Sequence, residues 1–356
     1  MSKKGRTTVY NNITSEEKLA QVNEENLELE DDFLEHLTST DRSPNTIFQY
    51  KSALHIFWVW NLEYNKNKSF VEITKREISR FQKHALNEWK WSPRRMRFVK
   101  SVMRSLENFI LNILDDDYPD YKKIWDKIEN PVNEAVREKS VFTDEELQIL
   151  LDKLVEQKDY MKACILALAI YGGRRKAELV RFKVSYFDKC NLICDGAIYK
   201  TPEKIKTKGH GQRGKLLYCF TLAKPFQPYL DLWLKERERL GITSDWLFPQ
   251  YKNGKWLDEH ITTSTTDSYA KTFSRMMNNN FYFHACRHKF VTALSEQNIP
   301  DNVIKDIVGW ESLELVSWYR DTEAEDTFDK YFGAEGIKKV EQKGLKDLEY
   351  TNKFEN

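Results

Sequence analysis

The sequence predicts a mainly α-helical protein with a small β-hairpin, divided into two domains. From Leu27 to Ile128 the apolar residues recur every three or four positions, which is the period of amphipathic helices. Between residues 196 and 222, two segments that favour strands flank a glycine-rich turn. At 356 residues, of which 40% are hydrophobic, the chain is long enough for two domains with separate cores.

The first part of the chain is expected to begin with a polar, flexible arm over residues 1–24. A helical domain follows over residues 25–128, with helices predicted at 46–62, 75–86 and 93–114. A Ser-Pro step stands at the start of two of these helices, and proline is favoured in the first turn of a helix. The aromatic residues of this domain are interpreted as its core.

A linker is expected over residues 129–140, and it leads to a second domain over residues 141–335. The first helix of this domain is predicted from Thr143 to Gln157, because it opens with a threonine that suits the N-cap and with acidic residues in the first turn. Another helix is predicted over residues 301–308. The remaining residues, 336–356, form a charged tail.

Charge is unevenly distributed along the chain, although the formal net charge is only +1. Acidic residues crowd the segment 24–35, whereas the segment 90–104 carries basic residues and no acidic one. A second basic cluster lies at 204–215. Clustered lysine and arginine favour the phosphate backbone, so double-stranded DNA is the predicted partner. The candidates for phosphate contact in the first basic segment are Arg94, Arg95, Arg97, Lys100 and Arg104.

Several classes of protein are excluded by composition. No run of about eighteen apolar residues is present, so no membrane span is expected, and the first residues lack the apolar stretch of a secretory signal. Five scattered cysteines indicate reduced thiols and a cytoplasmic location. Cys190 and Cys194 lack a second ligand pair at zinc-site spacing, and no carboxylate cluster of the two-metal kind is evident. No metal or other cofactor is therefore expected.

Three fragments of the second domain have the chemistry of a phosphate-binding active site. Arg175 is followed three residues later by Glu178 on a predicted helix, and His284 and Arg287 share one face of another helix. A guanidinium donates two parallel hydrogen bonds to a phosphate and stays charged. Two arginines and a histidine would therefore neutralise the charge that builds on a phosphodiester under attack. Tyr319 offers a nucleophile that is held as a covalent ester.

Together with Trp310, nine positions before Tyr319, these residues resemble the tyrosine recombinase (phage integrase) family. The pattern of that family is Arg, Lys, HxxR, His or Trp, and then Tyr nine residues later. The resemblance covers residues 140–331 well, and it covers the N-terminal half in outline, as the helical core-binding domain of the family. It implies a C-terminal tyrosine recombinase catalytic domain with Tyr319 as the nucleophile and Trp310 at the His/Trp position.

The same resemblance implies roles for the other residues of the fragments. Arg175 and Arg287 would clamp the scissile phosphate, and His284 would assist proton transfer and phosphate binding. Glu178 stands at the acidic position that buttresses the site. Tyr331 competes as the nucleophile, but it lies twenty-one positions after Trp310, and this spacing disagrees with the pattern.

The catalytic lysine of the family lies on a β-hairpin between the first two fragments, where it protonates the departing 5′ oxygen. In this chain one strand is predicted at 196–201 and its partner at 215–222. Lys208, directly before Gly209, matches the lysine-glycine pattern of the family best. Lys206 remains the alternative, because the turn is longer than the common form, and it is also a candidate for DNA contact.

One position departs from the pattern of the family. Arg174, directly before the first clamp arginine, stands where the family usually has an apolar residue. Such an arginine either faces DNA or is neutralised locally, and the preferred interpretation is a phosphate contact. Gly172 and Gly173 before it indicate a close approach of two chain segments at this point.

The function implied by the resemblance is site-specific recombination or integration, with DNA cleaved to a 3′-phosphotyrosyl intermediate and resealed without ATP. The family also implies a bacterial or phage-encoded enzyme that acts on the nucleoid as a homotetramer on two DNA sites, with accessory DNA-bending or directionality proteins as further partners. A thin apolar face at 337–348 leaves two interpretations of the tail open, a helix that docks on a neighbouring protomer or disorder. The alternative functions are a transposase of a mobile element, a type IB topoisomerase, a telomere resolvase, and a DNA-binding protein that does not cleave.

Overall fold

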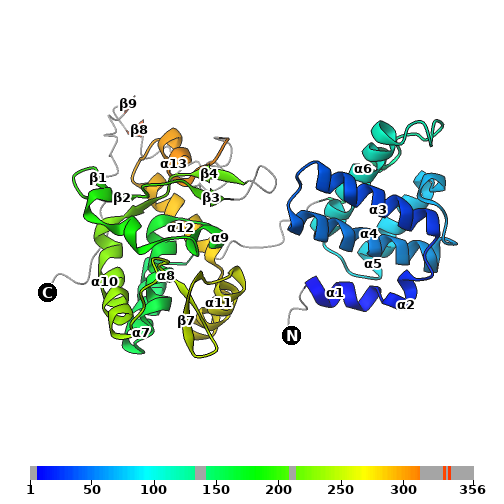
Figure 1. The fold of residues 1–356 in the computed structure, drawn as a ribbon. Coiled ribbons are helices and arrows are strands. Elements are labelled where there is room, and N and C mark those ends of the chain that lie inside the picture. Colours follow the sequence, from blue (N-terminus) through cyan, green and yellow to red (C-terminus); the bar gives the residue numbers. More distant parts are fainter. Residues whose placement is uncertain (1–5, 133–141, 208–213, 313–331, 334–335, 338–356) are drawn as a thin grey trace. The chain divides into compact units, whose positions relative to one another are not determined.

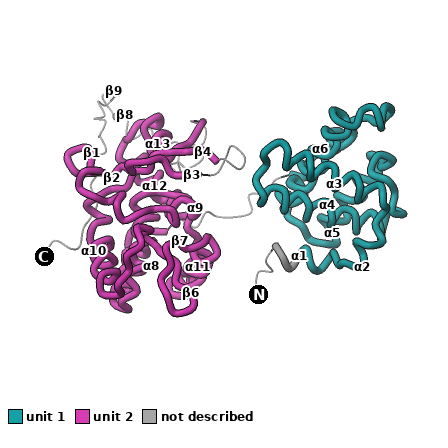
Figure 2. Tube along the Cα trace, in the orientation of Figure 1, with its two compact units in different colours: residues 1–138 teal, residues 139–356 magenta. Residues whose placement is uncertain are grey.

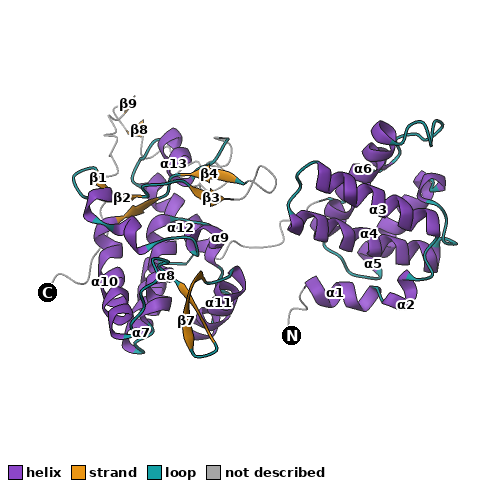
Figure 3. Ribbon diagram, in the orientation of Figure 1, coloured by secondary structure: helices purple, strands orange, loops and turns teal. Residues whose placement is uncertain are grey.

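The computed structural model describes residues 6–132, 142–207, 214–312, 332–333 and 336–337. The chain divides into two compact units, unit 1 (residues 1–138) and unit 2 (residues 139–356), and this division falls inside the predicted linker (Figure 2). Helices dominate both units, and the short strands of the described residues belong to unit 2 (Figure 3). The predicted fold class is confirmed. No helix in these described ranges combines the length and apolar character that crossing a membrane requires.

Unit 1 is a bundle of helices (Figure 1). The helices predicted at 46–62, 75–86 and 93–114 are all present, with their ends displaced by at most two residues. A serine or threonine caps each of the three, because its hydroxyl accepts a hydrogen bond from the backbone amide of the third helical residue. The elements of unit 1 are α1 (Arg6–Ile13), α2 (Glu16–Leu19), α3 (Glu24–Ser39), α4 (Pro44–Tyr64), η1 (Phe70–Glu72), α5 (Lys75–Asn87), α6 (Pro93–Ile113) and η2 (Trp125–Lys127).

The flexible arm predicted over residues 1–24 is wrong from residue 6 onward. This segment forms α1 and α2, and the side chains of Ile13 and Val22 are buried in the core of unit 1. A polar link adds to this contact: the hydroxyl of Tyr10 lies 2.6 Å from Nδ1 of His55 on α4. Two buried apolar side chains and one hydrogen bond hold a segment whose composition is otherwise polar.

The core of unit 1 is rich in aromatic rings, as predicted. The rings of Phe57, Phe70 and Phe81 have no exposed surface. Trp125 of η2 joins them, and its ring stacks on Phe70 with 6.0 Å between centroids. The segment after α6 therefore belongs to the core and returns the chain to the bundle.

Two charged residues of α6 hold this returning segment through its backbone. Lys100 is fully buried, and its ammonium donates to the carbonyls of Ile128 (2.6 Å) and Glu129 (3.1 Å). Glu107 is also fully buried, and one carboxylate oxygen accepts the amides of Ile124 and Trp125. Burial lowers the pKa of Lys100 to about 8 and raises the pKa of Glu107.

The prediction that Lys100 contacts DNA is therefore wrong. Position 100 falls on the apolar stripe of α6, between the buried side chains of Met96 and Met103, so the helix points it into the protein. Two neighbouring candidates also have partners inside unit 1. Arg97 donates twice to the carbonyl of Pro131, and Nε of Arg104 lies 2.7 Å from the carboxylate of Asp126.

Unit 2 is built around α8, which packs against α7, α10 and α12. Every residue from Ala163 to Ile170 is buried, so this helix is surrounded on all sides. The helices predicted at 143–157 and 301–308 correspond to α7 and α13. The helices of unit 2 are α7 (Asp144–Glu156), α8 (Tyr160–Gly172), α9 (Lys176–Leu179), η3 (Val184–Phe187), η4 (Lys189–Asn191), α10 (Ala223–Arg239), α11 (Thr263–Met277), α12 (Phe283–Glu296) and α13 (Asp301–Val308).

Short antiparallel strands cover part of this helical core. The predicted pairing of 196–201 with 215–222 is confirmed at its base, where Tyr199 pairs with Thr221. Residues 205–207, which were predicted to belong to the turn, form a further strand, and in this separate hairpin Lys206 pairs with Leu216. The strands are β1 (Leu192–Ile193), β2 (Ile198–Lys200), β3 (Ile205–Thr207), β4 (Lys215–Leu217), β5 (Phe220–Leu222), β6 (Pro249–Lys252), β7 (Lys255–His260), β8 (Phe332–Gly333) and β9 (Gly336–Ile337).

The substitution Lys100→Met is expected to lower the free energy of unfolding at pH 7 by about 1–3 kcal/mol, because two carbonyls lose their donor. The pKa of this lysine is about 8 in the folded protein, against an ordinary value of 10.5. Between these two pH values the unfolded chain binds more protons at Lys100 than the folded protein does. The wild type should therefore gain stability relative to the variant as the pH rises through this window, and lose it as the pH falls through 8. Urea unfolding at several pH values measures this difference, and a difference independent of pH would contradict the burial of a charged lysine.

Candidate active site

Arg175 stands at the N-cap of the short helix α9, directly after the end of α8. The sequence predicted that Arg175 lies inside a helix, whereas the structure places it just before the first helical residue. Its side chain is 31% exposed, and its Nη1 donates to Oε1 of Glu178 at 3.0 Å. The second oxygen of Glu178 accepts the backbone amide of Arg175 at 3.1 Å. Glu178 is itself buried, and it fixes both the backbone and the guanidinium of Arg175, whose side chain stays partly exposed.

His284 and Arg287 both lie on α12, as predicted, but they differ in exposure. His284 is exposed at the start of the helix, whereas Arg287 is fully buried. The Nη1 atom of Arg287 lies 3.9 Å from Oε2 of Glu178, so this one carboxylate serves both arginines. Loss of solvent around its ring, followed by repulsion from Arg287 and Arg175, lowers the pKa of His284. A histidine in this position is neutral at pH 7 and can exchange a proton with a reacting group.

The guanidinium of Arg287 also binds the backbone at two helix ends. Its Nη1 donates to the carbonyl of Gly173 at 3.0 Å, and its Nη2 donates to the carbonyl of Val308 at 2.8 Å. These carbonyls end α8 and α13 respectively, where helices leave acceptors without partners. Gly173 has a φ of 59°, and a Cβ there would lie 2.3 Å from the ring of Phe290, so only glycine fits this close approach.

Arg174 is buried, with 1% of its surface exposed, and it makes no contribution to an open phosphate site. Its Nε donates to the carbonyl of Gly172 at 2.8 Å, and its Nη2 donates to the carbonyl of Ile307 at 2.5 Å. The preferred interpretation from sequence, a phosphate contact, is therefore wrong, and the alternative of local neutralisation is correct. Two helix ends provide the compensating partial charge.

Trp310 follows α13 and is buried. The guanidinium of Arg287 lies over its ring, 5.3 Å from the centroid. Gly309 turns the chain at this point with a φ of 72°, and a Cβ there would lie 2.2 Å from Cδ1 of Leu217 on β4. The backbone amide of Trp310 donates back to the carbonyl of Lys305 at 2.9 Å. The predicted place of Trp310 at a helix end beside the site is confirmed.

The other predicted catalytic residues fall partly outside the described residues. Lys208, Tyr319 and Tyr331 all lie in segments that the structure does not describe. Lys206 is exposed on β3, and its backbone carbonyl accepts a hydrogen bond from Nη1 of Arg181. The described site therefore consists of Arg175, Glu178, His284, Arg287 and Trp310.

One basic and aromatic cluster beside the hairpin was not singled out from the sequence. Tyr218 is 38% exposed, and the ammonium groups of Lys200 and Lys204 lie 4.7 Å and 5.6 Å from the centroid of its ring. Alternation of exposed positions along the strands is the signal that points to it. In unit 1, Arg94 is exposed, and Arg95 lies over the ring of Trp91 at 4.6 Å.

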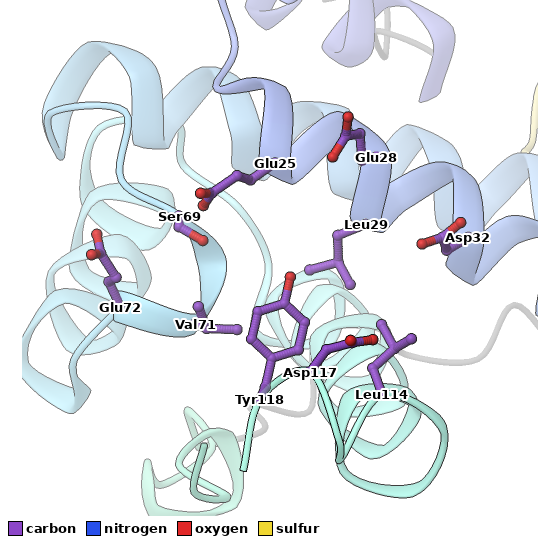
Figure 4. A pocket seen from close by; sticks show the side chains of 10 residues that line it. All are labelled: Glu25, Glu28, Leu29, Asp32, Ser69, Val71, Glu72, Leu114, Asp117 and Tyr118. Atoms are coloured by element: carbon purple, nitrogen blue, oxygen red, sulfur yellow. The ribbon is translucent and has the colours of Figure 1, made fainter. Parts of the chain in front are cut away.

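A cavity of about 320 Å³ lies in unit 1 and has the opposite electrostatic character (Figure 4). Carboxylates of α3, of the segment around η1 and of the segment after α6 line it, including Glu25, Asp32 and Asp117. Burial, followed by repulsion from these carboxylates, raises the pKa of Tyr118 at its edge. This acidic cavity would repel phosphate, so it is not a nucleic-acid site.

The substitution Glu178→Gln is expected to lower the free energy of unfolding by about 3 kcal/mol, because it leaves buried guanidinium charge without its carboxylate. Glu203→Gln is the matched control. Glu203 also pairs with a basic residue, Lys183, at 2.6 Å, but its side chain is 55% exposed, so its loss should cost less than about 1 kcal/mol. Chemical unfolding measures the loss of unfolding free energy in both variants. Equal losses would contradict the role of Glu178 in compensating buried guanidinium charge.

The chain matches two family models. Residues 140–326 match the phage integrase family, and residues 29–120 match the N-terminal SAM-like domain of phage integrases. The chain is 27% identical over 257 residues to the SPbeta prophage-derived recombinase-like protein YomM of Bacillus subtilis, covering 69% of this chain and 74% of the relative. It is 22% identical over 298 residues to the tyrosine recombinase XerA of Pyrococcus horikoshii, covering 83% of this chain and 89% of that protein.

The fold is also similar to that of a lambda integrase tetramer bound to a Holliday junction. The TM-score is 0.58 at 15% identity, and the match covers 83% of this chain and 76% of that chain. The first family match spans more than half of this chain, and it includes every described residue of the site. The chain belongs to the phage integrase family, and it is a tyrosine site-specific recombinase that acts on DNA.

Proposed function

We propose that this recombinase cleaves DNA by attack of Tyr319 on a phosphodiester that Arg175 and Arg287 hold, giving a 3′-phosphotyrosyl intermediate. The observation that carries the proposal is the convergence of Arg175, Glu178, Arg287 and Trp310, which come from three separate segments of the chain. The buried carboxylate of Glu178 thus faces two guanidiniums, those of Arg175 and Arg287. The excess positive charge matches a phosphodiester whose negative charge grows in the transition state.

Each residue has a distinct part in the proposed reaction. The guanidinium of Arg175 contacts a non-bridging oxygen directly, because 31% of this side chain is exposed to solvent. His284, exposed and neutral at pH 7, assists proton transfer at the tyrosine or at the phosphate. Arg287 contributes mainly as a fixed charge behind the site, because it is enclosed in this structure. Trp310 packs over it and keeps water away.

The general acid for the departing 5′ oxygen is proposed to be Lys208, with Lys206 as the alternative. Support comes from the hairpin that β3 and β4 form, because its strand β4 lies against the end of α13. Leu217 of β4 touches Gly309, and Lys215 of β4 lies 3.2 Å from Glu311.

DNA contact beyond the site is assigned to exposed basic residues of both units. In unit 1 the exposed residue is Arg94, with the partly buried Arg95, Arg97 and Arg104 as its neighbours. We also assign this role to Lys206 and to the lysines around Tyr218. By analogy with the lambda integrase tetramer, the enzyme is proposed to act as a homotetramer on two DNA sites. The reaction conserves bond energy in the ester, so it needs no ATP and no metal.

The substitution Tyr319→Phe is expected to abolish covalent attachment while DNA binding remains. Wild type and variant are incubated with nicked suicide substrates, and the protein-DNA adduct is separated on a denaturing gel. The wild type should form the adduct with or without EDTA, because a tyrosine nucleophile needs no metal. An adduct formed by the variant would assign the nucleophile to another residue such as Tyr331. Binding without any adduct from the wild type would favour the DNA-binding protein that does not cleave.

The substitution Arg175→Ala is expected to slow adduct formation on the order of 100-fold, because it removes one donor from the transition state. Lys176→Ala is the matched control, since Lys176 is the next residue and its ammonium is paired with Asp267 at 2.6 Å. The control should change DNA affinity slightly and leave the adduct rate at saturating DNA within about threefold. Rapid quench at saturating DNA compares the two, and equal rates would remove Arg175 from the proposed clamp.

A further inference from the structure

Two consecutive arginine contacts tie the end of α8 to the end of α13. Arg174 donates hydrogen bonds to the carbonyls of Gly172 and Ile307. Arg287 donates to the carbonyls of the residues that follow these in the chain, Gly173 and Val308. Four carbonyls at two helix ends thus share two buried guanidiniums. We call this arrangement the arginine clasp.

The clasp solves a physical problem that the close approach of these helices creates. The C-terminal end of a helix carries partial negative charge and carbonyls without partners in the helix. Two such ends in proximity would repel one another and leave buried acceptors unsatisfied, which costs roughly 1–3 kcal/mol for each group. A guanidinium fits because it is planar, stays charged and presents several donors in fixed directions.

The clasp also joins the two parts of the chain that carry the site. Arg175 follows Arg174 directly, and Trp310 follows Ile307 by three residues, after the turn at Gly309. The apolar packing of α13 against α12 and the strands places Ile307, Val308 and Trp310 in one cluster. Together with Arg287, Arg174 therefore fixes the Arg175 turn and the Trp310 turn relative to each other.

We propose that Arg174 is a positioning residue for strand cleavage, one that aligns Arg175 with the segment from Trp310 toward Tyr319 and makes no contact with DNA. The inference rests on the proposed function, since it concerns the rate of that cleavage. A displacement of about 1 Å between reacting groups can slow a reaction on the order of 100-fold. Loss of Arg174 should accordingly slow cleavage without weakening DNA binding.

The test compares Arg174→Met with Arg237→Met. Arg237 on α10 is an equally buried arginine, and its guanidinium likewise donates to backbone carbonyls, those of Ser244, Trp246 and Leu247. Within the described ranges, none of these contacts involves a residue of the site. Both variants should be less stable than the wild type. An effect on cleavage that only Arg174→Met shows is therefore due to displaced site residues and not to lower stability. All measurements are made well below the lower of the two melting temperatures.

Arg174→Met is expected to slow adduct formation at saturating DNA by about 10-fold to 100-fold, with its Kd for DNA changed by less than about threefold. Arg237→Met should keep the adduct rate within about threefold. The salt dependence of DNA binding should be the same for wild type and Arg174→Met, because no phosphate contact is lost. A shallower salt dependence in Arg174→Met would mean that Arg174 contacts a phosphate, and it would overturn the proposal. In that case log Kd would change by about one unit less per unit of log salt.

A second readout does not depend on catalysis. Hydrogen exchange of the backbone amides at 301–310 should accelerate in Arg174→Met and stay unchanged in Arg237→Met, because only the first variant releases the end of α13. An unchanged adduct rate or unchanged exchange in Arg174→Met would overturn the proposal. If the wild type forms no adduct, the proposed function fails, and exchange alone then decides whether the clasp fixes α13.

Discussion

The site depends on the burial of guanidinium charge at the meeting point of two helix ends. Arg174 and Arg287 are almost fully enclosed, and both donate hydrogen bonds to backbone carbonyls. Glu178 is the single buried carboxylate that contacts Arg175 and Arg287 among the described residues. Partial charges at helix ends satisfy the hydrogen bonds of a guanidinium without cancelling its full charge. The site therefore keeps a positive potential, which favours a phosphodiester and adds to the effect of burial in lowering the pKa of His284.

The same principle recurs in unit 1, where buried charged side chains fix backbone instead of binding a ligand. Lys100 and Glu107 stand one above the other on the apolar face of α6 and hold the segment that returns to the core. Lys100 therefore adds a charge to the basic segment 90–104 without adding a cation to the surface. Of the positively charged residues from 90 to 104, Arg94 is exposed and suited to a phosphate, whereas Lys100 is enclosed. Clusters of charge in a sequence thus overstate the charge that a surface presents.

The sequence predicted most of the helices, because caps and apolar periodicity are local signals that act over one or two turns. Ser92 before Pro93 marks the start of α6, and the structure begins the helix there. The errors concern contacts between distant segments. The partner of Arg174 on α13, Ile307, is 133 residues away, so no local pattern reveals that the side chain turns inward. For Lys100 the sequence did carry a signal, since its position belongs to the buried stripe of α6. The prediction of DNA contact followed its charge and not this position.

The chemistry of the clasp explains why arginine stands at position 174, where the family usually has an apolar residue. An apolar side chain could fill the space, yet it would leave the carbonyls of Gly172 and Ile307 without a donor. Lysine would keep the charge, but its ammonium is a compact group with one centre, and the two carbonyls are contacted by different nitrogens of one planar group. The geometry of two helix ends therefore requires a guanidinium. The presence of Arg174 is thus explained by its hydrogen bonds to two helix ends at the site, without a contact to DNA.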